Sequence, residues 1–312
     1  MPNRLNYEST FDVLGDILET LRFRGSIFFR SELAAPWGIS LENKSTPRFH
    51  VIFSGKCFIG MSEYEPVIAE EMDIIMLPHG RSHWIADQPG RELVASERAG
   101  DACELGDPFF QQGVITNRIM CGMVQFDLEA SHPFISSLPD IILFPIRECD
   151  DPIWSLVSLI DAEMKNNHGR KSLIADRLTE ALFIKLLHKF INDDTKATGF
   201  LAALGDRRMH MALSLIHQEP SHNWTLSSLS SRVGMSKATL VRHFNTTIGM
   251  APMAYVISWR LSKAYNAIKY SSATLENIST SLGFSSARAL TRAFEKQFGV
   301  TPSKMKKDTG KQ

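Results

Sequence analysis

The sequence predicts a multidomain protein with an all-β N-terminal half, a helical segment in the middle and an all-α C-terminal domain. Short runs of apolar, β-branched and aromatic residues, separated by Gly, Pro and charged residues, fill most of the first half. From residue 152 onward, apolar residues recur instead every three or four positions, which is the spacing of helices. With 312 residues, the chain is long enough for at least two domains.

The β-rich region follows a short amphipathic helix that the apolar spacing predicts over residues 11–21. Seven segments then have the composition of strands: SIFFRSEL, WGISL, RFHVIFSG, KCFIGM, PVIAE, DIIMLP and HWIAD. Many short strands at close spacing are typical of a barrel or a sandwich, and a small barrel holds one ligand in its interior. The residues that we expect to line such an effector pocket are Phe49, Phe53, Met61, His83 and Trp84.

Residues 151–192 form a predicted helical connector, with one helix over 152–164 and a second over 170–191. The apolar stripe of the second helix consists of Ile174, Leu178, Leu182, Leu186 and Phe190, widened by Phe183, Leu187 and Ile191. The stripe either packs on the barrel of its own chain or contributes to a homodimer interface, and its breadth favours the dimer. Residues 193–204 begin with a polar run and are interpreted as a linker.

The C-terminal domain, predicted over residues 205–308, contains one pattern twice. TLSSLSSRVGM begins at Thr225 and TLENISTSLGF begins at Thr274, and the offset of 49 becomes 50 after one inserted residue. Each copy predicts a short helix that ends at a glycine, Gly234 or Gly283, and a longer helix that begins just after it. Two helices joined by such a tight turn form a helix-turn-helix motif.

Charge separates the two halves of the chain and favours nucleic acid as the partner of the second. Residues 205–312 hold 15 Lys and Arg against 5 Asp and Glu, whereas residues 1–204 hold 19 against 29. A basic module on an otherwise acidic chain argues against the alternative of a helical hairpin that serves only as core. A continuous helix predicted over 252–270 would join the motifs and span ~27 Å, comparable with the ~34 Å between successive major-groove faces.

The exposed face of each second helix, which enters the major groove in such motifs, supplies the predicted DNA-binding residues. They are Lys237, Ala238, Val241, Arg242 and Asn245 in the first copy, and Ala287, Arg288, Thr291 and Arg292 in the second. Ala238 and Val241 suit contacts with thymine methyl groups. Because the two faces differ, one chain should recognise a non-palindromic site on double-stranded DNA with two unlike segments.

The C-terminal sequence also resembles a known family. The run GMSKATLVRHFNTTIGMAPMAYVISWRLSKA, followed by ISTSLGFSSARALTRAFEKQFGVTPSKM, is similar to the DNA-binding domain of AraC/XylS transcription regulators over about residues 207–306. The resemblance implies a bacterial regulator that contacts RNA polymerase and is more often an activator, and it adds Arg260 to the DNA-binding set. Members of the family commonly have an aromatic residue at the position of Leu290 and a polar residue at that of Ala287.

A second resemblance covers about residues 11–146. FHVIFSGKCFIG, EMDIIMLPHGRSHWIAD and RIMCGMVQFDLEASHPFISSLPDIILFP are similar to the cupin barrel that many AraC-type regulators carry as a sensor. One departure is Met72, where a glycine usually precedes Asp73. The resemblance implies that residues 1–150 form a cupin-like domain that binds a small-molecule effector of unknown identity.

Three histidines of this region, His50, His79 and His83, raise the alternative of a cupin metalloenzyme, an oxygenase or isomerase, fused to a DNA-binding domain. A cupin metal centre needs an H-x-H pair on one strand, but Val51 and Ile52 follow His50. We therefore predict no metal, no cofactor and no catalytic residue. An architectural DNA-binding protein without an effector is a third possibility.

The four cysteines, Cys57, Cys103, Cys121 and Cys149, form no CxxC pair, so the sequence predicts neither a zinc finger nor a disulfide scaffold. Cys121 lies in an apolar run, which suits either a buried inert thiol or, as an alternative function, a redox sensor. Neither a membrane-spanning run of ~20 apolar residues nor an N-terminal signal core is present, so we expect a cytoplasmic protein without a membrane partner.

Overall fold

The computed structural model describes residues 11–42, 44–62, 64–99, 110–126, 132–167, 172–192 and 198–309. By the contacts between its residues, the chain forms two compact units. We call residues 23–126 and 138–190 the barrel unit. Residues 1–22, 127–137 and 191–312 form the helical unit.

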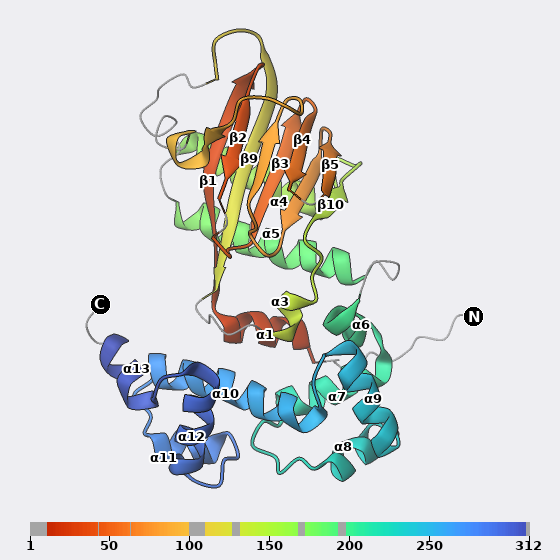
Figure 1. Cartoon of the computed structure of the whole chain (residues 1–312), viewed down its shortest axis with the longest axis vertical. Coiled ribbons are helices and arrows are strands. Elements are labelled where there is room, and N and C mark those ends of the chain that lie inside the picture. Colours follow the sequence, from red (N-terminus) through yellow and green to blue (C-terminus); the bar gives the residue numbers. More distant parts are fainter. Residues whose placement is uncertain are drawn as a thin grey trace. The chain divides into compact units, whose positions relative to one another are not determined.

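The barrel unit contains two five-stranded sheets, in which neighbouring strands are antiparallel except for β2 and β8 (Figure 1). The first has the order β1-β9-β3-β6-β10, with β1 at Phe23–Ala34, β9 at Ile115–Phe126, β3 at Arg48–Ser54, β6 at Asp73–Leu77 and β10 at Ile142–Pro145. The second has the order β5-β4-β7-β2-β8, with β5 at Tyr64–Ala69, β4 at Cys57–Met61, β7 at His83–Ala86, β2 at Gly38–Leu41 and β8 at Val94–Ala95. The seven predicted strands all form, so the all-β prediction is confirmed.

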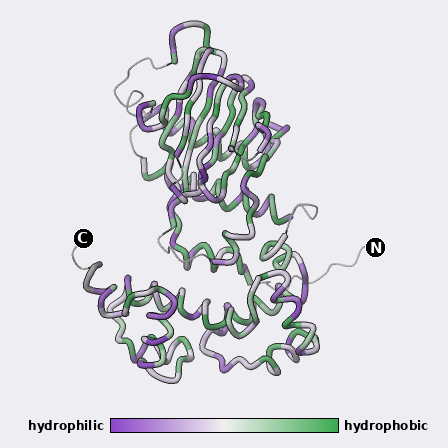
Figure 2. The backbone as a smooth tube through the Cα atoms, viewed as in Figure 1, coloured by the Kyte–Doolittle hydropathy of each residue, from purple (hydrophilic) through white to green (hydrophobic). Residues whose placement is uncertain are grey.

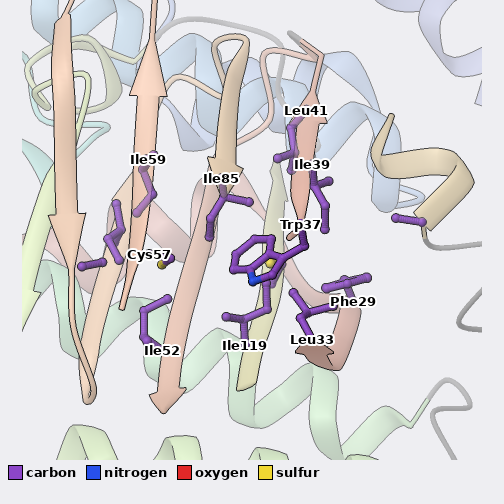
Figure 3. Close-up of a cluster of buried hydrophobic side chains, with 14 of the residues drawn as sticks. Phe29, Leu33, Trp37, Ile39, Leu41, Ile52, Cys57, Ile59, Ile85 and Ile119 are labelled. Carbon is purple, nitrogen blue, oxygen red and sulfur yellow. The ribbon is translucent and has the colours of Figure 1, made fainter. Parts of the chain in front are cut away.

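The core of the barrel unit lies between the two sheets, because side chains from both face the same apolar cluster (Figure 3). Trp37 is buried near its centre, and its indole nitrogen donates to the Asn117 side-chain oxygen at 3.0 Å. Ile52 and Ile119 come from the first sheet, whereas Ile85 comes from the second. The central strands of the first sheet are buried on both faces, since nearly every residue of β3 and every residue of β6 is buried, and hydrophobic residues dominate the middle of the unit (Figure 2).

Two helices cover the other face of the first sheet: α4 at Pro152–Asn166 and α5 at Leu173–Ile191. Phe53 of β3 packs against Trp154 of α4 with ring centroids 5.7 Å apart. Phe23 of β1 packs in the same way against Phe183 of α5, at 5.7 Å. Both predicted connector helices therefore form, and they belong to the barrel unit. The predicted break at residues 168 and 169 lies outside the described residues.

The helical unit contains the predicted double motif. Its helices are α1 at Val13–Leu21, α3 at Pro133–Ser136, α6 at Gly199–Gly205, α7 at Arg207–Gln218, α8 at Leu226–Arg232, α9 at Lys237–Thr247, α10 at Pro252–Tyr270, α11 at Leu275–Ser281, α12 at Ala287–Phe298 and α13 at Pro302–Thr309. Helix α10 is continuous over 19 residues, as its uninterrupted sequence predicts. Within the described ranges, no helix is long and apolar enough to cross a membrane.

Two features differ from the domain organisation expected from the sequence. Residues 199–204 were expected to belong to the linker, but they are part of α6, whose Phe200 and Leu201 are fully buried. Helices α1 and α3 were expected in the N-terminal domain, but their contacts group them with the C-terminal helices. Apolar spacing predicts that α1 buries one face, although it does not specify the surface that receives this face.

Candidate DNA interface and barrel interior

The first helix-turn-helix motif is built from α8 and α9. Gly234 ends α8 in the left-handed conformation, with φ +64°, which glycine adopts without steric cost. Ser236 then caps α9, because its hydroxyl accepts the backbone N–H of Thr239 at 3.1 Å. Leu240 and Phe244 are fully buried, so one face of α9 is fixed in the core and the opposite face is left outside.

The outer face of α9 carries the predicted DNA-binding residues of the first copy. Together with Leu226 and Thr246, all five line one shallow surface depression: Lys237, Ala238, Val241, Arg242 and Asn245. Val241 is half-buried, whereas the other four are exposed. The structure therefore brings this predicted set together on one surface.

The second motif, from α11 and α12, repeats this construction. Gly283 has φ +70°, and the Ser286 hydroxyl accepts the backbone N–H of Ala289 at 3.1 Å. Arg288 and Arg292 are exposed on α12, while Ala287 and Thr291 are half-buried. The Thr291 hydroxyl donates to the Ala287 carbonyl at 2.9 Å, so its proton is used within the helix. The two arginines are thus the more accessible groups of the second face.

The predicted effector-pocket residues do not share one surface. Along β3, Phe53 faces α4, and Phe49 lies on the same side of the strand because it is four residues away. Met61 belongs to the core cluster between the sheets. His83 is also turned inward, whereas the neighbouring Trp84 lies over Gly60 on the other side of the second sheet. Only Met61 and His83 of the five therefore face the interior.

The barrel interior contains a buried chain of polar side chains, of which the pocket prediction included only His83. The Nδ1 atom of His50 lies 2.9 Å from Sγ of Cys121, and the Nε2 atoms of His50 and His83 are 2.9 Å apart. Nδ1 of His83 lies 2.8 Å from the Arg81 carbonyl oxygen. All three side chains are buried, with exposed fractions of 0% for His50, 4% for His83 and 3% for Cys121.

The direction of these hydrogen bonds follows from the charge state of the histidines. Burial lowers the pKa of His83 to about 4 and that of His50 well below its usual value, so both are neutral at pH 7. A carbonyl oxygen only accepts, so His83 donates from Nδ1 to Arg81, and its Nε2 accepts from His50. Nδ1 of His50 is then left to accept the Cys121 thiol proton. Every proton along this row of hydrogen bonds, from Cys121 to the Arg81 carbonyl, is therefore donated to a neighbour within the row.

His79, the third histidine considered as a metal ligand, lies apart from this chain and bonds to the Leu138 carbonyl at 2.8 Å. In the portion of the chain that is described, no group of three or more His, Cys, Asp or Glu side chains is placed to hold a metal ion.

Comparisons with known proteins agree with both halves of this architecture. A family model described as Cupin matches residues 12–192, more than half of the chain, and a model described as a helix-turn-helix domain matches residues 229–308. The chain belongs to the cupin family. A Streptomyces antibioticus protein described as an AraC-like transcription regulator is 26% identical over 307 residues, covering 95% of this chain and 98% of the relative.

Two further proteins are similar over nearly their whole length. The regulator AlkR of Acinetobacter baylyi is 24% identical, covering 93% of this chain and 97% of the relative. The crystal structure of ToxT from Vibrio cholerae O395 aligns with a TM-score of 0.37 and 14% identity, covering 91% of this chain and 96% of that one. Together with the two family models, the relatives show that this cupin protein is a DNA-binding transcription regulator of the AraC type.

Arg260 has a structural role in this AraC-type regulator that the sequence did not predict. Its guanidinium donates three hydrogen bonds to backbone carbonyls: to Pro220 at 2.6 Å, to His222 at 2.7 Å and to Gly283 at 3.0 Å. Three of its five N–H donors are used within the protein, so Arg260 has a structural role, and its contact with DNA stays a prediction. It joins α10 to the segment before the first motif and to the turn of the second.

Helix α1 of the regulator is bound to α7 and α10 through one carboxylate. Asp16 accepts from Nδ1 of His217 at 2.8 Å and from the Lys263 ammonium at 2.9 Å. Nε2 of His217 lies 2.8 Å from the Tyr255 hydroxyl, and its ring stacks on Trp259 with centroids 3.9 Å apart. Burial raises the pKa of Asp16, but the bonds from His217 and Lys263 outweigh burial and lower it, so the carboxylate remains charged.

Proposed function

We propose that this AraC-type regulator binds, as a homodimer, non-palindromic DNA sites with two unlike segments, under the control of a small molecule received by the barrel unit. The observation that carries the proposal is the pair of recognition helices, α9 and α12, in one compact unit with the continuous helix α10 between their motifs. Their cores repeat, whereas their outer faces differ.

The charges on these faces support contact with DNA. Lys237 and Arg242 on α9, and Arg288 and Arg292 on α12, are exposed, and none of them forms an ion pair with another described residue. Cations that the protein leaves unpaired are available for phosphates and for the guanine edge in the major groove.

A DNA selection experiment tests the two-segment site. Sequencing fragments retained by the full-length protein should give a motif with two unlike halves. Arg292→Ala should weaken binding by ~1–3 kcal/mol and relax the base preference in one half, and Arg242→Ala should act on the other half. Arg24→Ala removes an exposed cation of the barrel unit and should leave the motif unchanged. A palindromic motif would contradict the proposal.

Control by a small molecule is supported by the cupin family of the barrel unit and by its buried polar groups. Thermal-shift screening of metabolites with the full-length protein tests it, followed by DNA-binding titrations with each hit. DNA affinity that no bound metabolite changes would favour the architectural protein without an effector.

The proposed dimer uses the outer surface of α4 and α5. Most of the predicted stripe of α5 packs within its own unit: Leu182, Phe183, Leu186, Leu187 and Phe190 are buried. Ile174 of the stripe is 59% exposed, and outside the stripe Leu173 of α5 and Leu159 of α4 are 70% and 55% exposed. Leu159 also lines an apolar groove with Leu156 and Ile184.

Sedimentation of the full-length protein tests this dimer. Leu159→Glu places a charge on the groove and should shift the equilibrium toward the monomer. Val114→Glu is a matched control, because Val114 is 85% exposed and belongs to the barrel unit but not to the groove. Equal dissociation of both variants, or of neither, would count against this interface.

The remaining expectations rest on the resemblance to AraC-type regulators. We propose that the protein acts in the cytoplasm, where it contacts RNA polymerase and activates transcription. In vitro transcription from a selected site tests the direction, since an activator raises the initiation rate when the protein is added.

Redox sensing remains a second candidate because of the contact between Cys121 and His50, which accepts the thiol proton at 2.9 Å. The burial of Cys121 opposes it. Equal DNA binding by Cys121→Ser with and without hypochlorite, in an assay where the natural protein responds, would confirm the thiol as the sensor, whereas a response in both proteins would exclude Cys121. Elemental analysis of purified protein tests the metalloenzyme alternative.

A further inference from the structure

Arg48 is a buried cation for which the described residues provide no ion-pair partner. It lies at the start of β3 and exposes 5% of its surface, and its Nη1 atom is buried without a hydrogen-bond acceptor. In the part of the chain that the structure describes, its guanidinium forms no ion pair. Glu97 and, more weakly, Cys121 interact with it over a longer distance, but the Glu97 carboxylate is already bonded to Lys44 at 2.6 Å.

The strand register places Arg48 on the inner face of the first sheet. Arg48 lies opposite Leu77 of β6, and His50 lies opposite Cys121 of β9. Leu77 and Cys121 both belong to the core between the sheets. Residues directly opposite in an antiparallel pair share a face, so Arg48 and His50 point into the same interior.

A buried guanidinium charge destabilises the folded state unless an anion and hydrogen-bond acceptors compensate it. Burial accordingly lowers the pKa of Arg48. The neighbouring histidines supply no negative charge, because both are neutral, and the Cys121 thiol proton is bonded to His50 in the chain that ends at the Arg81 carbonyl. Among the described residues, no negative charge is therefore paired with the positive charge of Arg48.

We propose that the effector of this regulator is a small organic monoanion whose carboxylate pairs with Arg48 beside His50 and His83 in the barrel interior. A monocarboxylate supplies the single missing charge, and its two oxygens match the donor geometry of a guanidinium. The apolar part of the acid would contact hydrophobic residues such as Leu77, opposite Arg48, and Leu41, opposite His83. This inference rests on the proposed control by a small molecule and names its chemical class.

The test compares acids with their neutral amides on the full-length protein. Butyrate, octanoate and benzoate are titrated against butyramide, octanamide and benzamide by calorimetry and thermal shift, at constant ionic strength set with chloride. We expect at least one acid to bind and to raise the melting temperature, while its amide does neither. Binding of no acid, or of acid and amide alike, would overturn the proposal. Stabilisation by inorganic phosphate alone would overturn the carboxylate as the recognised group.

Variants of Arg48 assign the binding to this residue. Arg48→Met should lower the affinity for the acid by roughly 10- to 100-fold, since a hydrogen-bonded ion pair is lost. The ligand-free variant should melt at the same temperature as the natural protein or higher, because an uncompensated buried charge is removed. Arg48→Lys keeps a cation and should retain part of the affinity. Arg24→Met is the control for an exposed arginine and should bind as the natural protein does. Unchanged affinity in Arg48→Met would refute the site.

DNA titrations separate this inference from the proposed function. If the acid binds through Arg48 but DNA affinity does not change, the anion site stands and effector control fails. If a neutral metabolite changes DNA affinity equally in the natural protein and in Arg48→Met, effector control stands and the anion site fails.

Discussion

The two helix-turn-helix motifs have the same skeleton but different surroundings at their turns. A Cβ atom added at Gly234 would meet no atom within 4 Å, whereas one added at Gly283 would lie 2.5 Å from the Ser221 carbonyl oxygen. The Gly283 carbonyl also accepts a bond from Arg260. The first turn is thus open, and the second is a packed junction. Repetition of a sequence motif therefore does not imply that equivalent residues have equivalent roles.

The largest expected difference between the motifs concerns these two glycines. Gly234→Ala should cost about 1 kcal/mol, which is the penalty of a left-handed conformation alone. Gly283→Ala adds the clash with the Ser221 backbone, and we expect a loss of roughly 2–4 kcal/mol. Urea unfolding of both variants measures the two values. Equal losses would show that the second turn is not a packed junction.

Replacement of Arg260 should have the next largest effect. Arg260→Met removes three charge-assisted hydrogen bonds to carbonyls and should destabilise the protein by about 2–3 kcal/mol. Arg242→Ala, a matched loss of an arginine from an exposed face, should leave stability within ~0.5 kcal/mol while DNA binding weakens. Measuring both stability and DNA binding for the two variants distinguishes a residue that stabilises the motifs from one that contacts DNA. If Arg260→Met weakened DNA binding without a loss of stability, the predicted DNA contact would be supported.

Low pH should destabilise the residues that pack around the first motif but not those of the second. Burial lowers the pKa of His132 to about 3 and also lowers that of His217, despite the bond to Asp16. In the unfolded state each histidine has a pKa near 6.5 and is protonated below that pH, whereas in the folded state it stays neutral. The free energy of unfolding therefore falls as the pH drops below ~6.5. His132 alone should cost about 2 kcal/mol at pH 5.

No histidine occurs after residue 243, so the core of the second motif lacks this sensitivity. Amide hydrogen exchange at pH 7 and pH 5, corrected for intrinsic rates, should show lost protection in α7 and α10 but not in α12. His132→Phe should reduce the change. Uniform loss of protection across both motifs would contradict this asymmetry.

The smallest effects, and the most similar ones, should come from the two helix caps. Ser236 and Ser286 each accept a backbone N–H at 3.1 Å on the exposed side of the helix start. Replacement of either by alanine should cost about 1 kcal/mol. Thermal unfolding of the two variants should therefore agree closely. Unequal losses of stability would show that the two motifs also differ at their helix caps.

Local patterns explain which parts of this structure the sequence predicted. The strands, the repeat and the exposed faces of α9 and α12 follow from alternation, helical spacing and turn residues, which act within a few positions of the chain. The inward or outward orientation of Phe49 and Phe53 depends on strand register, which alternation alone does not determine. The carbonyls that receive Arg260 come from segments 23 and 40 residues away, and no local pattern indicates them.

Arg48 is a different case, because a signal was present in the sequence. A lone arginine at the start of an apolar strand, two residues before a histidine, is unusual in a sheet core. The alternation that puts His50 inside puts Arg48 inside as well. The predicted pocket did not include Arg48, although it lies on the same face of β3 as His50.

The membership of α1 and α3 in the helical unit has a consequence for dissection of the molecule. The polypeptide passes from one unit to the other four times, between residues 22 and 23, 126 and 127, 137 and 138, and 190 and 191. A single proteolytic cut, or a gene truncated at the start of α7, therefore cannot release the DNA-binding half intact. Such a fragment would lack Asp16 and leave the buried imidazole of His217 without its carboxylate partner. For the same reason, a chimera of two related regulators joined at a single position would not exchange one complete unit.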